Sequence, residues 1–237
     1  MEKEKIVAIT ESEMIFKGTK AFACFSGGKE SVLSYYRALK SGISISYLVN
    51  MVSEDGERCR SHGVSSDCLK LQSDAIGVPV IQRKTSWQNY ENEFKKIISD
   101  LKNEGIKIGI FGDIDLQEHR DWVERVCKDI EIKPILPLWK GKREELLKDF
   151  IQLGFRAIVI ATQAFSMGKE WLGRKIDAEF IKNLKDLDNI DLCGEKGEYH
   201  TFVFNGPIFK KPVEIKTGEK IFRDNHWFLK IIPKLNK

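Results

Sequence analysis

The amino-acid sequence predicts an α/β protein built around a parallel β-sheet. Short apolar runs alternate with segments whose apolar residues recur at helical spacing, and the first run leads directly into the string Ser-Gly-Gly-Lys and a helix. Strands that alternate with helices form parallel sheets with helices on both faces. With 237 residues, of which 42% are hydrophobic, the chain is long enough for one large domain or two small ones.

The first half of the chain contains four predicted strands and four predicted helices. The strands are expected at 20–25, 44–52, 78–81 and 107–111, and the helices at 32–39, 65–75, 87–101 and 118–129. Gly42, Gly77 and Gly105 follow three of the helical segments, where glycine commonly ends a helix. Tyr35, Tyr36, Trp87 and Phe94 are expected in the core, because they share helical stripes with aliphatic residues.

A change of composition at 133–142 indicates a domain boundary, since this stretch holds two of the six prolines. We therefore expect an N-terminal extension at 1–19, a nucleotide-binding domain at 20–137 and a smaller α/β domain at 138–237. The second domain is expected to contain helices at 143–153 and 178–187, a strand at 156–161, and β segments at 201–204, 213–216 and 226–232.

Composition excludes several classes of function. The net charge is only +4 with both signs interspersed, so nucleic-acid binding is not indicated. No apolar run approaches the roughly 20 residues that span a bilayer, and no secretion signal precedes the first strand, so a cytoplasmic location is expected. Five scattered cysteines without a C-x-x-C pair indicate reduced thiols and no zinc site. A homodimer is left open.

The string Ser26-Gly27-Gly28-Lys29-Glu30-Ser31 is suited to binding phosphate. Glycines allow a tight turn with backbone N–H groups pointing inward, and the N-terminus of a helix favours an anion. The two serine hydroxyls add further hydrogen-bond donors, and the lysine adds a positive charge. The string is neither a Walker A loop nor a G-x-G-x-x-G dinucleotide motif. The alternative is a plain strand-to-helix turn that needs glycine for its geometry.

SGGKES resembles the SGGKDS loop of the N-type ATP pyrophosphatases, and further strings resemble their diphthine–ammonia ligase-like family. These are RSHGV at 60–64, FGDI at 111–114, RVC at 125–127, PLW at 137–139, WLGRKID at 171–177 and CGEKGEYHTFVFNGPIF at 193–209. The resemblance covers about 20–209, and its last two strings are the most specific. It implies a Rossmann-like nucleotide domain of the adenine nucleotide α-hydrolase type, followed by a smaller α/β domain.

The resemblance also implies a reaction and its participants. The enzyme would adenylate a carboxylate, on a small molecule or a protein side chain, releasing pyrophosphate, and ammonia would then displace AMP. ATP and Mg²⁺ are the expected cofactors. Two positions depart from the family pattern: Glu30 stands where Asp is usual, and Asp113-Ile114-Asp115 replaces a less acidic string. The acyl substrate is left open.

Candidate site residues fall into three sets. The predicted nucleotide-binding residues are Ser26, Gly27, Gly28, Lys29, Glu30, Ser31, Asn50, Met51, His62, Gly112 and Asp113, with Glu30 and Asp113 also expected to bind the metal. Lys29, Glu198 and His200 are the expected catalytic residues. Arg120, Glu195, Gly197 and Tyr199 are expected to contact the substrate.

Several of these residues, and two of their neighbours, Asp115 and Trp139, also have a plainer interpretation. Asp115 would cap a helix and Asp113 would be solvated, while Arg120 would lie on an exposed helix face. The string 194–201 would be a surface turn that enters a strand. Trp139 either packs the junction between the domains or lines a pocket.

Two other functions stay open on the sequence. One is sulfur transfer to tRNA within the same superfamily, which normally requires a catalytic cysteine pair or a metal cluster. The other is a module that senses adenine nucleotides without turnover.

Overall fold

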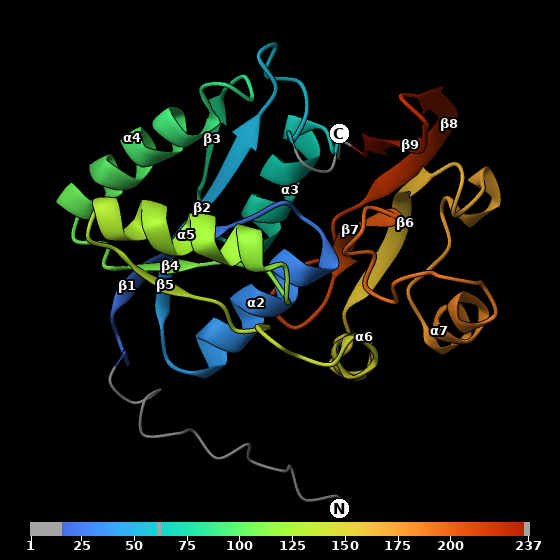
Figure 1. Ribbon diagram of the computed structural model, residues 1–237, viewed down its shortest axis with the longest axis horizontal. Helices are drawn as coiled ribbons and strands as arrows, with labels where there is room; N and C mark the ends of the chain where they lie inside the picture. The colour runs from blue at the N-terminus through green and yellow to red at the C-terminus, as the bar shows by residue number, and fades with distance from the viewer. Residues whose placement is uncertain (1–15, 61–62, 235–237) are drawn as a thin grey trace, which may run out of the picture.

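The protein consists of two β-sheets with helices packed around them (Figure 1). The computed structural model describes residues 16–60 and 63–234. The predicted α/β class is confirmed, with a five-stranded parallel sheet in the first half and a four-stranded antiparallel sheet in the second. None of the helices in these described residues is long and apolar enough to cross a membrane.

The first sheet has the strand order β3-β2-β1-β4-β5, and every neighbouring pair is parallel. Its strands are β1 (Lys20–Cys24), β2 (Ser44–Val52), β3 (Val80–Lys84), β4 (Ile108–Ile110) and β5 (Lys133–Ile135). β5 was not predicted, because its three residues include Pro134 and lie in the proline-rich stretch. A proline is tolerated there since β5 is an edge strand.

Helices cover both faces of this sheet, as the alternation along β1 requires. They are α2 (Lys29–Lys40), α3 (Ser66–Ile76), α4 (Tyr90–Asn103) and α5 (Gln117–Asp129). Phe22 points to a core formed with α4 and α5, whereas Ala21 and Ala23 point to the core that contains α2 and α3. The prediction that Trp87 is a core residue was wrong: it lies in the turn before α4 and is 63% exposed.

The second sheet has the order β7-β6-β9-β8 and is antiparallel. Its strands are β6 (Arg156–Gln163), β7 (Tyr199–Asn205), β8 (Ile215–Arg223) and β9 (His226–Pro233), accompanied by α6 (Arg143–Gln152), α7 (Ala178–Lys185) and the short 3-10 helix Lys169–Trp171. Asp224 and Asn225, both at positive φ, close the β8–β9 hairpin, as these residue types commonly do.

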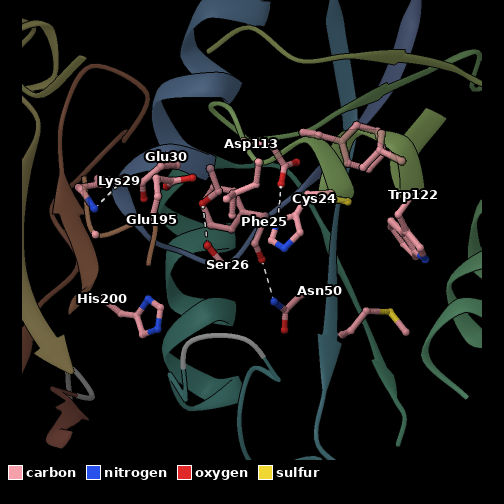
Figure 2. A pocket seen from close by; sticks show the side chains of 18 of the residues that line it. Cys24, Phe25, Ser26, Lys29, Glu30, Asn50, Asp113, Trp122, Glu195 and His200 are labelled. Atoms are coloured by element: carbon pink, nitrogen blue, oxygen red, sulfur yellow. Dashed lines mark hydrogen bonds and ion pairs between the residues drawn. The ribbon is translucent and has the colours of Figure 1, made fainter. Parts of the chain in front are cut away.

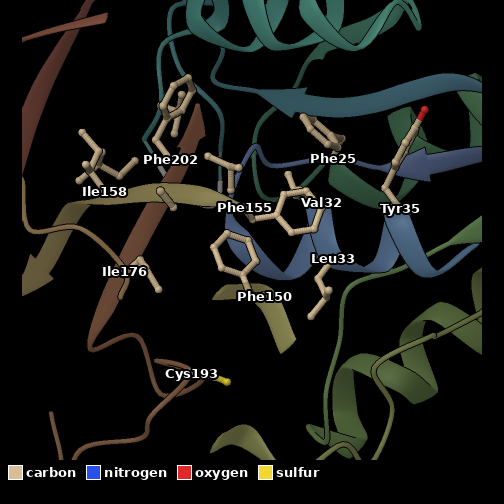
Figure 3. Close-up of a cluster of buried hydrophobic side chains, with 14 of the residues drawn as sticks. Phe25, Val32, Leu33, Tyr35, Phe150, Phe155, Ile158, Ile176, Cys193 and Phe202 are labelled. Atoms are coloured by element: carbon tan, nitrogen blue, oxygen red, sulfur yellow. The ribbon is translucent and has the colours of Figure 1, made fainter. Parts of the chain in front are cut away.

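One hydrophobic core joins the two halves (Figure 3). Phe25 and Val32 from the first half lie in the same cluster as Phe150, Phe155 and Phe202 from the second. Strand β7 therefore packs beside the beginning of α2, where the Gly-Gly string lies. This arrangement holds the carboxyl ends of the parallel strands opposite the segment that leads into β7.

Candidate active site

A cavity of about 530 Å³ lies between the carboxyl ends of β1, β2 and β4 and the segment 193–200 (Figure 2). Open α/β sheets generally bind ligands at this edge. Twelve of the predicted site residues line the cavity. They are Ser26, Lys29, Glu30, Ser31, Asn50, Met51, Gly112, Asp113, Glu195, Gly197, Tyr199 and His200.

The Ser-Gly-Gly turn connects β1 to α2 in a conformation that requires glycine. Gly27 has φ +78°, and a Cβ atom there would lie 2.3 Å from Oε1 of Gln72. Ser26 Oγ donates to Ser31 Oγ at 3.2 Å and accepts the N–H of Gly28 at 3.4 Å. Gly27 and Gly28 thus shape the loop, while the two serines line the cavity.

Gly112 lies against the beginning of α2. A Cβ atom on Gly112 would come within 3.2 Å of the backbone nitrogen of Ser31, so a larger residue would crowd the helix N-terminus. On β2, which pairs with the other side of β1, Asn50 Nδ2 donates to the carbonyl oxygen of Phe25 at 2.8 Å. The small size of Gly112 thus lets α2 begin close to β4, and the Asn50 hydrogen bond holds the chain just before the loop.

Lys29 is buried, and its ammonium group is directed at the C-terminal segment. Its Nζ lies 2.6 Å from Glu30 Oε1, donates to the carbonyl oxygen of Cys193 at 2.6 Å, and lies 4.3 Å from the centre of the Tyr199 ring. Burial opposes the charge, but the carboxylate of Glu30 and the other partners raise the pKa of Lys29 above its usual range. Lys29 is therefore a permanent cation at the wall of the cavity.

Three carboxylates from different segments, those of Glu30, Asp113 and Glu195, line the cavity. His119 Nδ1 lies 3.2 Å from Asp113 Oδ1, and this hydrogen bond raises the pKa of His119. Burial, together with the nearby Glu30 carboxylate, raises the pKa of Glu195 to about 7. The cavity thus places a cation and a cluster of acids side by side.

Two other predicted residues approach from β7. Burial, with the charge of Lys29, lowers the pKa of His200 to about 4, so His200 is neutral at physiological pH. The hydroxyl of Tyr199 donates to the carbonyl oxygen of Leu192 at 2.6 Å, while its ring lies beneath Lys29. Tyr199 therefore contributes an aromatic surface to the cavity rather than a free hydroxyl.

Glu198 does not line the cavity, contrary to its expected catalytic position. Its side chain is 3% exposed, and its two oxygens accept the backbone N–H groups of Asp191 at 2.8 Å and Lys196 at 3.0 Å. A buried carboxylate that accepts two backbone N–H groups of its own segment holds that segment in a turn. Glu198 therefore shapes the segment 191–198, and Glu195 is the acid of this string that reaches the cavity.

Arg120 is also absent from the cavity wall. Its Nε donates to Glu124 one turn along α5 at 2.6 Å, and its guanidinium group lies 4.9 Å from the centre of the Trp139 ring. Arg120 therefore lies on the helix surface, as the plainer interpretation expected. Trp139 packs against this arginine. The N-cap of α5 is Leu116 and not Asp115. The carboxylate of Asp115 pairs with Arg143 instead. His62 lies outside the described residues.

An apolar wall beside the phosphate loop was missed from the sequence. It comprises Phe25, Val49, Trp87, Tyr90, Phe94, Phe111, Leu116, Trp122 and Val123. Trp87 stacks on Tyr90 with ring centres 5.9 Å apart, and Arg60 lies 4.7 Å from the centre of the Trp87 ring. Helical spacing identifies such residues as a buried stripe but does not tell whether the stripe ends at a cavity. Cys24, His119, Cys193 and Gly194 complete the missed residues.

Comparison with known proteins relates both halves of the chain to one family. The diphthine–ammonia ligase of Rattus norvegicus is 26% identical over 226 residues, which are 84% of this chain and 84% of that protein. The diphthine–ammonia ligase of Danio rerio is 26% identical over 230 residues, 86% of this chain and 89% of that protein. A solved structure described as a predicted subunit of tRNA methyltransferase from Methanocaldococcus jannaschii is 16% identical, with a TM-score of 0.43, over 82% of this chain and 100% of that chain.

Family models cover almost all of the sequence. Residues 19–134 match the diphthamide synthase N-terminal domain, and residues 142–235 match the diphthamide synthase C-terminal domain. The strings that resemble the diphthine–ammonia ligase-like family lie within these two matches or in the short stretch between them. The chain belongs to the diphthamide synthase family of N-type ATP pyrophosphatases.

Proposed function

We propose that this protein uses ATP to join the carboxylate of diphthine to ammonia, with AMP and pyrophosphate as by-products. One observation carries the proposal: the Ser-Gly-Gly loop and the acid-bearing segment 193–200 face one cavity. These two elements come from the two halves that match diphthamide synthase domains. The substrate is inferred from the names of the relatives, which are diphthine–ammonia ligases. The cavity offers separate regions for ATP and for the nitrogen donor.

The phosphate chain of ATP would bind at the beginning of α2. The hydroxyls of Ser26 and Ser31 line the cavity there, and the helix N-terminus favours an anion. The adjoining apolar wall suits a flat heterocycle such as adenine, because aromatic side chains offer stacking surfaces. Together, these regions would place the α-phosphate near the middle of the cavity.

The reaction would proceed in two displacements. An oxygen of the substrate carboxylate attacks the α-phosphorus, the bond to the β-phosphate bridging oxygen breaks, and pyrophosphate leaves. Ammonia then attacks the acyl carbon, AMP leaves, and the nitrogen loses a proton to give the amide. Catalysis of this kind depends mainly on positioning and charge stabilisation, so it requires no protein nucleophile.

Glu30 and Asp113 fit the role of magnesium ligands. Mg²⁺ in phosphate-transfer sites generally binds one or two carboxylates, several waters and the substrate phosphates. Both carboxylates line the cavity close to the phosphate loop, although one oxygen of Glu30 is already paired with Lys29. When bound, the ion would offset the negative charge of the phosphates.

Glu195 is the best-placed residue for the nitrogen substrate. It lines the cavity beside Glu30 and Lys29, and its ionised form attracts ammonium from solution. Glu30 and Asp113 lie close enough to contribute to the field at Glu195. The acid cluster would thus concentrate the nitrogen donor near the acyl-adenylate.

The sulfur-transfer alternative has weak chemical support. The two thiols that line the cavity are those of Cys24 and Cys193, and burial raises the pKa of both well above the ordinary value. A protonated thiol is a poor nucleophile. Among the described residues, no group of three or more His, Cys, Asp or Glu side chains is arranged to hold a metal ion.

The proposal is tested by supplying ATP, Mg²⁺, ammonium and a peptide that carries diphthine. We expect AMP and the amidated peptide to form in equal amounts, with ¹⁵N from labelled ammonium found in the product by mass spectrometry. ADP as the protein-dependent product would overturn the proposed reaction type. Tight ATP binding with no turnover of any carboxylate offered would favour the nucleotide-sensing alternative.

A further inference from the structure

Strand β7 contacts the phosphate loop through its backbone and through one side chain. The N–H of Val203 donates to the carbonyl oxygen of Gly27 at 3.0 Å, and the N–H of Lys29 donates to Thr201 Oγ1 at 3.1 Å. Gln72 Nε2 donates to both Gly27 O, at 3.0 Å, and Val203 O, at 2.6 Å. The loop is therefore bonded to the second sheet at two successive peptide groups.

The first of these bonds determines where the next N–H points. The carbonyl of Gly27 and the N–H of Gly28 belong to one planar trans peptide, so they point in opposite directions. Because Val203 and Gln72 hold the Gly27 carbonyl, the Gly28 N–H is directed toward Ser26 Oγ at the cavity wall. A rotation of this peptide would remove the hydrogen bond that the Gly28 N–H gives to Ser26 Oγ at the phosphate site.

The second bond replaces an ordinary helix cap. Gly28 occupies the N-cap position of α2 and offers no side-chain acceptor. Thr201, which is 1% exposed and 172 residues away in the chain, supplies the acceptor for the first helical N–H instead. The N–H of Lys29 is thereby satisfied by protein, and that of Gly28 donates to Ser26 Oγ, which leaves the N–H groups of Glu30 and Ser31 for an anion.

We propose that β7 holds the phosphate loop in its anion-binding conformation, with Thr201 as the positioning residue. The inference rests on the proposed function in one respect, namely that the loop binds the phosphates of ATP. Thr201 itself contacts the loop backbone and does not line the cavity. The C-terminal half of the chain is thus required for nucleotide binding as well as for the substrate.

Two isosteric variants separate this role from a general contribution to folding. Thr201→Val removes the acceptor, and Thr162→Val is the matched control. Thr162 is a fully buried threonine on the neighbouring strand β6, and its hydroxyl bonds to Gly168 O at 3.3 Å. The affinity of each variant is measured by calorimetric titration with ATP and with adenosine. ATP has phosphates that reach the loop, whereas adenosine has none.

We expect Thr201→Val to weaken ATP binding by about tenfold, as for the loss of a buried hydrogen bond, and adenosine binding by less than about twofold. Thr162→Val should change neither, and Thr201→Ser should restore ATP affinity. If Thr201→Val weakens the binding of ATP and adenosine equally, or leaves ATP affinity unchanged in a folded protein, this inference is wrong and the proposed function is unaffected. If the unaltered protein binds ATP no more tightly than adenosine, the phosphate role of the loop fails first.

A measurement on the unaltered protein keeps the inference testable if Thr201→Val does not fold. Amide hydrogen exchange followed by NMR should show the Lys29 amide protected before nucleotide is added, because Thr201 already binds it. ATP should then add protection at the Glu30 and Ser31 amides and little at Lys29. A Lys29 amide that exchanges freely without ATP and becomes protected only with it would contradict the inference.

Discussion

The ammonium group of Lys29 donates a hydrogen bond to the carbonyl oxygen of Cys193 at 2.6 Å, across 164 residues of sequence. The lysine of the phosphate loop is therefore anchored to the segment that carries Glu195. The same ammonium group pairs with Glu30 and lies over the Tyr199 ring. Lys29 thus links the phosphate loop directly to the acidic segment.

We predict that Lys29→Ala weakens ATP binding at least about tenfold, or about 1.4 kcal/mol. The variant removes a buried positive charge beside the loop and leaves Glu30 without its partner. Isothermal titration calorimetry measures the effect, and Lys40→Ala, at the exposed end of the same helix, is the control. Unchanged affinity with an intact circular dichroism spectrum would show that Lys29 serves only to hold the C-terminal segment.

Glu195→Gln should lower the rate of amide formation by something like 10²-fold while ATP binding is retained. The variant keeps the size of the side chain but removes the negative charge that Glu195 carries in the cavity above its pKa of about 7. Turnover at saturating ATP and varied ammonium is the measurement. A rate within about twofold of the unaltered protein would exclude Glu195 from the reaction.

Glu198→Gln should mainly destabilise the protein, by about 1–3 kcal/mol, because one of two partly buried N–H groups loses its charged acceptor. Denaturant unfolding gives the free energy, and turnover per folded molecule should change far less than in Glu195→Gln. The opposite ranking of the two variants in turnover would restore Glu198 as the catalytic acid.

Acidification should destabilise the protein through His200. Its pKa in the folded state is about 4, below the value near 6.5 expected on unfolding, so the unfolded state binds the proton first as pH falls. Stability is therefore lost between about pH 6.5 and 4, by about 2 kcal/mol at pH 5. His200→Gln should lose correspondingly less stability than the unaltered protein between pH 7 and pH 5, as measured by urea unfolding. Parallel pH dependence of the two proteins would contradict this assignment.

Cys24→Ala and Cys193→Ala, separately and together, should leave AMP formation within a few fold of the unaltered protein. Both thiols are protonated at neutral pH, and amide formation needs no thiolate. AMP release followed by chromatography is the measurement. A loss of more than about 10²-fold in a folded variant would instead favour sulfur transfer.

Local sequence determined the nucleotide half of this protein almost completely. The buried run of β1, the glycines at 27 and 28, and the helical spacing that follows interact within a few residues, so the loop could be located without tertiary information. The comparisons confirm the resemblance to the diphthine–ammonia ligase-like family. This resemblance directed attention to the string 193–209 in the second half, which includes residues of the cavity wall. β5 was not predicted, because a strand of three residues that includes a proline shows no recognisable alternation of apolar and polar residues.

Only the tertiary structure decided which side chains of the motifs reach the cavity. Glu195 and Glu198 are both acids in one glycine-containing string, yet one faces the cavity and the other binds two backbone N–H groups. Arg120 and Trp122 lie two positions apart on α5, and the helix turns only Trp122 into the cavity. Such choices depend on contacts between segments far apart in the chain, as between Thr201 and Lys29, and no local pattern encodes them.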